Sequence, residues 1–530
     1  MMNIFELLRE SGVPCSFSIG GTICSADNER LHFFRQIPIH DIIYDSRRAA
    51  PNTVFLCLPG VRADGHAYAS AVYDSGCRLF FAEHTLALPP DALVILVPDT
   101  RAALPFLSDA LFGHPQKELT VIGITGTKGK TTIVNLIAQC LNAAGISCGT
   151  IGTIGITYNG KWFPTVNSTP ESYVLHKTFR EMADQDVKVV VMEVSSLALC
   201  RHRVDGIQFD IAAFTNLSED HISEIEHPDF THYKTSKMKL FSMCDYAVMT
   251  EDGAYAAEFQ QSCQCPYVTF GLNDTAAFHA FDIKPWKHDT ALGISFSIWE
   301  RTVERERQKE TASHASIAQE TVTLRIPGTF NAQNALCVIA ILRKLGLAYK
   351  DFLLPLSKAT VPGRFEILDV LDYCTVVLDY AHNEMSMRSL LETVRAYHPK
   401  RIITLYGSIG GRAQNRRREL ACVTGDLSDY AVITSDNPDY EDPNAITAEI
   451  ASYYTDDMCP HTVITDRREA IFYVLEMAKP GDILLFCGKG HETYQIIRGV
   501  HVPFSEKAII EETCAAMRRQ DTAAAILQNI

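Results

Sequence analysis

The sequence has no cysteine pairs at metal-binding spacing, no long apolar run and no excess of basic residues. Its 16 cysteines are scattered singly without a Cys-x-x-Cys pair, and Cys263 and Cys265 are too close together and lack a partner pair for a zinc site. We therefore expect reduced thiols. No uncharged apolar stretch of about 18 or more residues occurs, which predicts no membrane span.

The charge balance argues against a nucleic-acid partner. The formal net charge is -15, whereas phosphate backbones attract basic surfaces. Residues 1–6 lack a basic segment leading into an apolar one, so we expect no signal peptide and a cytoplasmic protein. With 47% hydrophobic and 21% charged residues, the composition is that of a folded chain.

The length of 530 residues exceeds what one hydrophobic core supports and predicts several domains. Apolar strand-like runs alternate with segments of helical spacing, as in residues 119–124 followed by 133–144, which indicates an α/β fold. We predict a small N-terminal α/β domain, a central doubly wound sheet with a phosphate loop, and a C-terminal Rossmann-like domain. Their expected bounds are 1–112, 113–360 and 361–530. The mixed charges of residues 301–320 predict a solvated loop or hairpin.

The segment 125–132 predicts a phosphate-binding loop because it joins a strand to a helix. Gly126 and Gly129 allow backbone N–H groups to approach phosphate, Lys130 supplies a positive charge, and Thr131 offers a hydroxyl to Mg²⁺. The general pattern requires glycine six residues before the lysine, where this chain has Ile124. By itself the loop suggests a nucleotide site, with a turn of no function as the alternative.

The chain resembles the Mur ligase family, and within it the enzymes that add the third residue of the peptidoglycan stem peptide. That family writes its loop Thr-Gly-Thr-x-Gly-Lys-Thr, with Lys128 here in the variable place. The resemblance runs nearly end to end. Further blocks that match in order are 167–171, 193–196, 215–221, 232–237, 328–334, 362–366, 379–383, 436–438 and 488–492.

The resemblance assigns catalytic roles that the residues alone leave open. Glu193 ends a buried strand, where a carboxylate needs a partner, whereas Lys237 by itself predicts an ordinary exposed helix lysine. The resemblance implies that Lys130, Glu193, His221 and Lys237 are catalytic. It also implies two Mg²⁺ ions, held by Thr131, Glu193, His221 and a Lys237 carbamylated by CO₂.

The resemblance also implies three sets of binding residues. For ATP they are Gly126, Thr127, Lys128, Gly129, Lys130, Thr131, Thr132, Asn331, Arg364 and Asp379, with His382 and Asn383 in support. For UDP-MurNAc-dipeptide they are Ser46, Ser168, Thr169, Ser195 and Arg203. For the amino acid they are Arg412, Asp436, Asn437, Asp439, Gly488 and Glu492. From the residues alone, Asn331 could instead cap a helix start, and Ser46 could simply form a turn.

The implied reaction is ATP-dependent amide formation through an acyl phosphate, releasing ADP and phosphate. Its substrates would be UDP-MurNAc-L-Ala-D-Glu and a free amino acid, and we expect a monomer with no nucleic-acid or membrane partner. The family's meso-diaminopimelate enzymes carry Asp-Asn-Pro-Arg, but this chain has Asp439 in the fourth place. An acid there repels a second carboxylate, so we expect L-lysine, with meso-diaminopimelate or another amino acid as the alternative.

Two departures from the family pattern keep other functions open. Segment 410–418 differs from the usual Gly-Gly-Asp-Arg-Asp, and Leu197 stands where the family has histidine. A non-catalytic protein that binds a muramoyl nucleotide is therefore one alternative. The other is a folylpolyglutamate synthase, which shares the loop and the Asp-Tyr-Ala-His-Asn turn but normally lacks the N-terminal unit.

Overall fold

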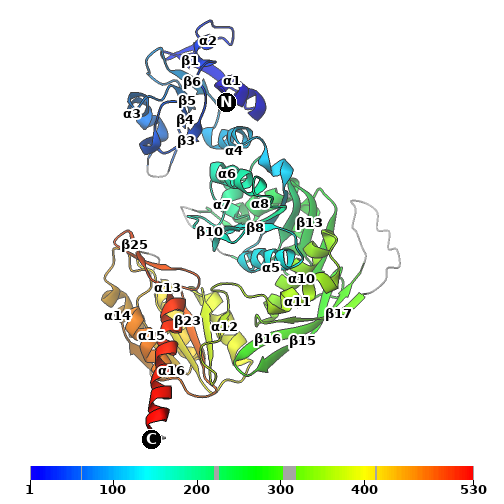
Figure 1. Ribbon diagram of the computed structural model, residues 1–530, viewed down its shortest axis with the longest axis vertical. Helices are drawn as coiled ribbons and strands as arrows, with labels where there is room; N and C mark the ends of the chain where they lie inside the picture. Colours follow the sequence, from blue (N-terminus) through cyan, green and yellow to red (C-terminus); the bar gives the residue numbers. More distant parts are fainter. Residues whose placement is uncertain are drawn as a thin grey trace. The chain divides into compact units, whose positions relative to one another are not determined.

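A computed structural model describes residues 2–60, 63–219, 222, 226–301, 318–411 and 415–528 (Figure 1). The chain divides into two units, the first ending at Phe270 and the second beginning at Gly271. Residues 302–317 of the predicted loop lie outside the described ranges. The three domain bounds predicted above stay a prediction.

The first unit begins with a six-stranded sheet in the order β2-β1-β6-β5-β4-β3. Strands β3 to β6 are parallel, and β1 pairs antiparallel with β2 and β6. Because alternate residues face opposite sides, β4 places Val54 and Leu56 in one core and Phe55 in another. The elements are α1 (Ile4–Ser11), β1 (Ser16–Ile19), β2 (Thr22–Cys24), α2 (Leu31–Phe34), β3 (Asp41–Ile43), β4 (Thr53–Leu56), α3 (Ala69–Asp74), β5 (Leu79–Ala82), β6 (Leu93–Leu96) and α4 (Thr100–Leu111).

A second sheet of the first unit positions the phosphate loop. Its order is β10-β9-β8-β11-β7-β12-β13-β14, parallel from β8 to β14 with an antiparallel β9–β10 edge. The strands are β7 (Thr120–Thr125), β8 (Cys148–Gly152), β9 (Gly155–Tyr158), β10 (Lys161–Phe163), β11 (Val189–Glu193), β12 (Phe209–Phe214), β13 (Cys244–Thr250) and β14 (Tyr267–Gly271). From β7 the chain runs to β8, β9 and β10 on one side, returns to β11 between β8 and β7, and then moves outward on the other side through β12 to β14. Ligands of such open α/β sheets bind at the carboxyl ends of the strands.

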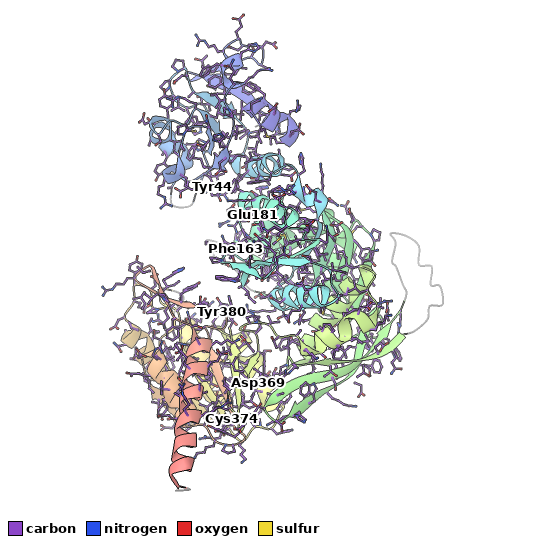
Figure 2. All side chains as sticks on the ribbon, viewed as in Figure 1. Tyr44, Phe163, Glu181, Asp369, Cys374 and Tyr380 are labelled. Atoms are coloured by element: carbon purple, nitrogen blue, oxygen red, sulfur yellow. The ribbon has the colours of Figure 1, made fainter. Side chains whose placement is uncertain are left out.

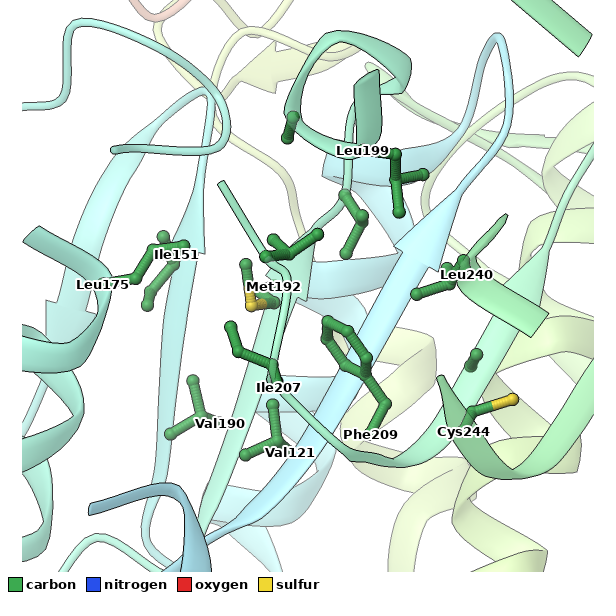
Figure 3. Close-up of a cluster of buried hydrophobic side chains, with 14 of the residues drawn as sticks. Val121, Ile151, Leu175, Val190, Met192, Leu199, Ile207, Phe209, Leu240 and Cys244 are labelled. Atoms are coloured by element: carbon green, nitrogen blue, oxygen red, sulfur yellow. The ribbon is translucent and has the colours of Figure 1, made fainter. Parts of the chain in front are cut away.

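The core of this sheet is continuous across its central strands (Figure 3). Val121 of β7, Val190 of β11 and Phe209 of β12 are fully buried and pack with Leu175 and Leu240 from the helical side. This burial supplies most of the favourable free energy for assembling the strands. The helices are α5 (Lys130–Ala143), α6 (Ser172–Ala183), α7 (Ser196–Cys200), α8 (Phe230–Met238) and α9 (Ala256–Ser262).

The second unit starts with three antiparallel strands that our sequence analysis did not identify. These are β15 (Phe278–His288), β16 (Ala291–Glu300) and β17 (Ala318–Leu324), followed by α10 (Thr329–Lys344) and α11 (Tyr349–Lys358). Most residues in the second half of β15 are exposed, and this half therefore shows no continuous apolar run.

The rest of the second unit is a sheet in the order β18-β19-β23-β20-β21-β22, parallel except for β18. Its strands are β18 (Glu366–Leu368), β19 (Thr375–Asp379), β20 (Ile402–Tyr406), β21 (Tyr430–Ile433), β22 (His461–Val463) and β23 (Ile483–Cys487). Its helices are α12 (Glu384–Arg395), α13 (Asn415–Leu427), α14 (Pro443–Ser452), α15 (Arg467–Glu476) and α16 (Glu506–Gln528). A hairpin of β24 (Tyr494–Ile497) and β25 (Val500–Pro503) precedes α16.

A buried ion pair fixes the start of α16 in the second unit. Arg467 donates to Glu506 Oε1 at 2.9 Å and to the carbonyl oxygens of Ser435 at 3.1 Å and Cys487 at 2.7 Å. Both charged side chains are fully buried. Removing one partner of such a pair typically costs about 3–5 kcal/mol, so this contact ties α16 firmly to the ends of β21 and β23.

The cysteines are mostly packed in cores, and no disulfide joins any two of them within the described ranges. Cys263 and Cys265 have a third neighbour that spacing could not show, because Cys265 Sγ lies 3.5 Å from the Sγ atoms of both Cys263 and Cys244. In the described residues no helix is long and apolar enough to cross a bilayer.

Candidate functional site

The phosphate loop is held in shape by the end of the neighbouring strand β12. Thr215 Oγ1 donates to the Lys128 carbonyl at 2.7 Å, and Asn216 Oδ1 accepts from the Lys128 N–H at 2.9 Å. Gly126 has φ +146°, and a Cβ atom there would lie 1.9 Å from Thr215 Oγ1. Glycine is therefore required at this position.

Two lysines converge on one carbonyl oxygen of this loop. Lys130 Nζ donates to the Gly126 oxygen at 2.8 Å and to the Thr127 oxygen at 3.1 Å, while Lys237 Nζ donates to the same Gly126 oxygen at 2.9 Å. Lys237 is 1% exposed, and its ammonium lies 4.6 Å from the centre of the Tyr233 ring. Taken by itself, Lys237 was predicted to be an exposed helix lysine. That prediction was wrong, because Lys237 lies on the buried face of α8 with Tyr233 and Ser236.

Glu193 at the end of β11 places a buried carboxylate beside the loop. Its Oε1 accepts from Thr131 Oγ1 at 2.9 Å and from the Thr153 N–H at 2.7 Å. The carboxylate is 1% exposed, and a hydroxyl and a carboxylate are oxygen ligands of the kind that Mg²⁺ takes. The described residues contain no group of three or more His, Cys, Asp or Glu side chains that could hold a metal. His221, the other predicted side-chain ligand, lies outside the described residues.

Three of the residues predicted to contact the muramoyl-dipeptide lie together behind Glu193. Thr169 Oγ1 donates to the Glu193 carbonyl at 2.9 Å and accepts from the Ser195 N–H at 3.0 Å. Arg203 donates to the Thr169 carbonyl at 3.0 Å and to Glu171 Oε1 at 2.9 Å. The chain thus builds a connected polar wall at this edge of the sheet.

The other two residues of that set lie apart from this network. Ser168 is half-buried and directly precedes Thr169, whereas Ser46 begins a short 3₁₀ helix, Ser46–Arg48, in the N-terminal sheet domain. The Asp45 side chain caps that turn by accepting from the Arg47 N–H at 3.1 Å. The predicted contact between Ser46 and UDP-MurNAc-dipeptide stays a prediction.

A histidine pair near this wall was missed by the sequence analysis. His227 is fully buried, with Nε2 2.9 Å from Ser196 Oγ and Nδ1 2.8 Å from His232 Nδ1. The ring of His232 in turn lies 3.8 Å from Cys200 Sγ, measured from Nε2. No spacing rule links these residues in the sequence, so only the packing of α7 against α8 reveals them.

In the second unit, the residues predicted to contact the nucleotide occupy two places. Asp379 at the end of β19 accepts from the N–H groups of Phe365 at 2.7 Å and Ala381 at 2.8 Å. Burial raises the pKa of Asp379, while the Arg364 guanidinium lowers it. Arg364 also lies 4.7 Å from the centre of the Tyr380 ring, which Figure 2 labels.

The second place is the start of α10, where the two predicted asparagines bond to each other. Asn334 Nδ2 donates to Asn331 Oδ1 at 2.9 Å, and Asn331 Nδ2 donates to the Pro327 carbonyl at 2.6 Å. Both amides are buried. Asn331 therefore does tie down the helix start, as the alternative interpretation supposed, and its predicted contact with adenine stays a prediction.

The residues predicted to grip the amino acid gather around a lysine that the sequence analysis left without a role. Lys489 is fully buried and donates to Asn437 Oδ1 at 2.9 Å and to Glu492 Oε2 at 2.5 Å. Asp436 Oδ1 lies 3.8 Å from its ammonium. Burial raises the pKa of Asp436, and Lys489 lowers it. A Cβ atom on Gly488 would lie 2.6 Å from Asp436 Oδ2, so glycine is needed there.

Two residues of the predicted acceptor set stand outside this cluster. Arg412 lies outside the described residues. Asp439 has φ +52°, and its Oδ1 accepts from the Gly499 N–H at 2.7 Å. The Asp439 carboxylate is thus already used by the protein. Arg417, in the segment 410–418 that departs from the family pattern, is buried and donates to Glu449 at 2.5 Å and Glu441 at 2.6 Å.

Comparison with known proteins gives two family matches. Residues 124–342 match the Mur ligase middle domain, and residues 363–490 match the Mur ligase glutamate ligase domain. A relative from Caldanaerobacter subterraneus subsp. tengcongensis, named UDP-N-acetylmuramoyl-L-alanyl-D-glutamate--2,6-diaminopimelate ligase, is 35% identical over 480 residues, which is 90% of this chain and 95% of that protein. A relative of the same name from Geobacillus kaustophilus is 35% identical over 475 residues, covering 88% and 92%.

Solved structures show the same architecture. A structure of a diaminopimelate ligase of that name has a TM-score of 0.66 and 25% identity, and covers 93% of this chain and 98% of its own. A folylpolyglutamate synthase from Mycobacterium tuberculosis has a TM-score of 0.56 and 16% identity, and covers 73% of this chain and 92% of its own. At that identity the second likeness concerns the fold alone.

Gly126→Ala tests whether the loop geometry is needed for nucleotide binding. The added methyl group would collide with Thr215 Oγ1, so we expect ATP affinity, measured by calorimetry, to fall at least about tenfold, or about 1.4 kcal/mol. Gly145→Ala is the matched control, since Gly145 also has positive φ (+81°) but has nothing within 4 Å of the added atom. An unchanged ATP affinity in Gly126→Ala would contradict this account of the loop.

Proposed function

Because the chain belongs to the Mur ligase family, we propose that it joins 2,6-diaminopimelate to UDP-MurNAc-L-Ala-D-Glu while converting ATP to ADP and phosphate. Its reaction class is that of an ATP-dependent amino-acid ligase of peptidoglycan synthesis. The observation that carries the proposal is the phosphate loop with two lysines on the Gly126 oxygen, set beside the buried Glu193. We place the enzyme in the cytoplasm and expect it to act as a monomer.

The first step would transfer the γ-phosphoryl group of ATP to the D-Glu carboxylate. Lys130 and the loop N–H groups would neutralise charge that develops on the transferred group. Thr131 and Glu193 offer oxygen ligands suited to Mg²⁺, which would supply further positive charge at the phosphates. The predicted second ion, with His221 as ligand, remains part of the proposal. Thr169, Ser195 and Arg203 would orient the dipeptide.

The second step would be attack of an amine on the acyl phosphate. The cluster of Lys489, Asn437 and Glu492 presents both charge signs, which suits the α-carboxylate and α-ammonium of an amino acid. Tyr380 steadies Glu492 by donating to its Oε1 at 3.2 Å. Release of phosphate then leaves the amide.

The surroundings of Lys237 favour the predicted carbamate. Two ammonium groups on one oxygen repel each other, and CO₂ addition would make Lys237 an anion that attracts Lys130 while keeping one N–H for the Gly126 carbonyl. The carbamate would also add a ligand for the predicted second ion.

The choice of amino acid differs from our expectation of L-lysine. That expectation assumed an Asp439 carboxylate facing the ligand, whereas the carboxylate accepts a backbone hydrogen bond from Gly499. The relatives are named for 2,6-diaminopimelate. L-Lysine stays as the second candidate, because the cavity beside Asp439 is also lined by Glu441, Asp442 and Asp466.

Two rival functions are less well supported. A folylpolyglutamate synthase matches only the fold, over 73% of this chain. A non-catalytic binding protein would have no need for a buried Lys237 and a buried Glu193 beside the loop lysine Lys130.

Lys130→Ala tests the reaction class. Phosphate release from ATP with UDP-MurNAc-L-Ala-D-Glu and diaminopimelate should fall at least about 10²-fold, since loss of one aligned donor costs this much. Lys188→Ala, whose side chain is 67% exposed, is the control and should keep the wild-type rate. Wild-type turnover by Lys130→Ala would refute the mechanism. A wild-type preference for L-lysine would refute only the choice of amino acid.

Carbon-13 NMR under ¹³CO₂ tests the Lys237 carbamate. We expect one carbamate signal in the wild-type protein and none in Lys237→Arg, because a guanidinium does not add CO₂. Lys234→Arg is the control, since Lys234 lies on the same helix but pairs with Glu258 at 2.6 Å, and it should keep the signal. No signal from the wild-type protein, with or without nucleotide, would rule out the carbamate.

A further inference from the structure

Asp439 clamps the turn of the β24–β25 hairpin. Its N–H donates to the Ile496 carbonyl at 2.9 Å, and its own carbonyl accepts from the Arg498 N–H at 2.8 Å. Its carboxylate accepts from the Gly499 N–H at 2.7 Å. Arg498 and Gly499 both have positive φ, +51° and +77°, as a tight two-residue hairpin turn requires. Asp439 therefore fixes the backbone position from which the Arg498 side chain extends.

Arg498 lines a cavity of about 710 Å³ that adjoins the amino-acid cluster. Pro438 and Asp439 in its wall directly follow Asn437 in the chain. Gln495, also in the wall, donates to the Asp436 carbonyl at 2.9 Å. A side chain that extends from an amino acid held by the Lys489 cluster would therefore have this cavity beside it.

Some charged side chains that line this cavity have partners among the described residues, and one does not. Glu441 is bonded to Arg417 at 2.6 Å, and Asp466 accepts from the Glu469 N–H at the start of α15. The cavity's other arginine, Arg467, is bound to Glu506. By contrast, the Arg498 guanidinium makes no hydrogen bond or ion pair with any residue of the described ranges, although carboxylates line the same cavity. A guanidinium left open in this way can receive a carboxylate through two parallel hydrogen bonds.

We infer that Arg498 recognises the distal carboxylate of the diamino acid, and that Asp439 is the positioning residue that holds the Arg498 turn in place. This inference rests on the proposed function. Diaminopimelate carries a carboxylate and an ammonium at its far end. Arg498 would take the carboxylate, and the acidic residues of the cavity would attract the ammonium. The chain would thus supply the required cation from the hairpin instead of from position 439.

Arg498→Ala should raise the KM for diaminopimelate about 10- to 100-fold, the range expected for losing a charged hydrogen-bonded contact of about 1.5–3 kcal/mol. The KM values for ATP and UDP-MurNAc-L-Ala-D-Glu should stay within about twofold, since neither contacts the hairpin in this account. Activity with L-lysine, which has no distal carboxylate, should be unchanged or improved. Arg498→Lys should show a smaller rise, because it keeps the charge but loses the paired donors.

Asp439 variants separate positioning from direct recognition. Asp439→Asn keeps an oxygen for the Gly499 N–H and should keep the KM for diaminopimelate, whereas Asp439→Ala should raise it as Arg498→Ala does. A strong effect of Asp439→Asn would overturn the positioning role. Arg468→Ala, an exposed arginine of α15 that does not line the cavity, is the control for general effects of charge loss.

The possible outcomes distinguish the inference from the proposed function. If the wild-type enzyme uses diaminopimelate and Arg498→Ala keeps its KM, the inference is wrong while the ligase function stands. If the wild-type enzyme uses only L-lysine, no distal carboxylate is bound and the inference is also wrong. If no amino acid supports phosphate release, the proposed function itself fails. Thermal unfolding of each variant shows that a raised KM reflects binding by a folded protein.

Discussion

The carbonyl oxygen of Gly126 is the point on which the proposed nucleotide site of the first unit depends. It accepts hydrogen bonds from Lys130 and Lys237, which come from two different helices, α5 and α8. The Gly126 oxygen can accept both hydrogen bonds because Gly126 adopts a positive φ that other residues avoid. Thr215 Oγ1 occupies the place where a side chain at position 126 would begin. One backbone conformation therefore sets the position of both lysines. Thr131, on the first turn of α5, brings Glu193 into the same network.

The proposed amino-acid site of the second unit follows the same physical rule. A fully buried Lys489 is stable there because Asn437 and Glu492 accept its hydrogen bonds and Asp436 lies nearby. Leaving such a charge without partners would cost several kcal/mol. Each unit thus buries a lysine, Lys237 in the first and Lys489 in the second, among hydrogen-bonding groups. These groups could form hydrogen bonds with a charged substrate instead. The hydrogen bonds that stabilise each buried lysine therefore come from the same groups that would receive the ligand.

The sequence predicted the strand–helix alternation well where strands are fully buried. Parallel strands are covered on both faces, and their sequences are therefore mostly continuous apolar runs. This is the case for β11, β19, β20 and β23. The antiparallel β15–β17 were missed, since an exposed face removes that signal. The strand–loop–helix geometry of segment 125–132 was also predicted, because its glycines and lysine are contiguous in the chain.

Side-chain surroundings could not be predicted in the same way. Lys237 lies on a short helix with both exposed and buried faces, and its sequence does not say which face it takes. His227, which precedes α8, and Ser196 of α7 meet only through tertiary packing. Asp439 is the clearest case: its charge suggested a ligand contact, but its carboxylate bonds to a hairpin turn 60 residues away in the sequence. Long-range partners of this kind are set by tertiary structure and leave no local pattern.

Transfer of oxygen-18 from substrate to phosphate tests the central claim most directly. UDP-MurNAc-L-Ala-D-Glu would be labelled with ¹⁸O in the reacting carboxylate and turned over with unlabelled ATP, diaminopimelate and water. If the carboxylate attacks the γ-phosphate, one labelled oxygen per turnover leaves with the phosphate, and mass spectrometry detects it. Phosphate that carries no label would show that no acyl phosphate forms, and would contradict the account.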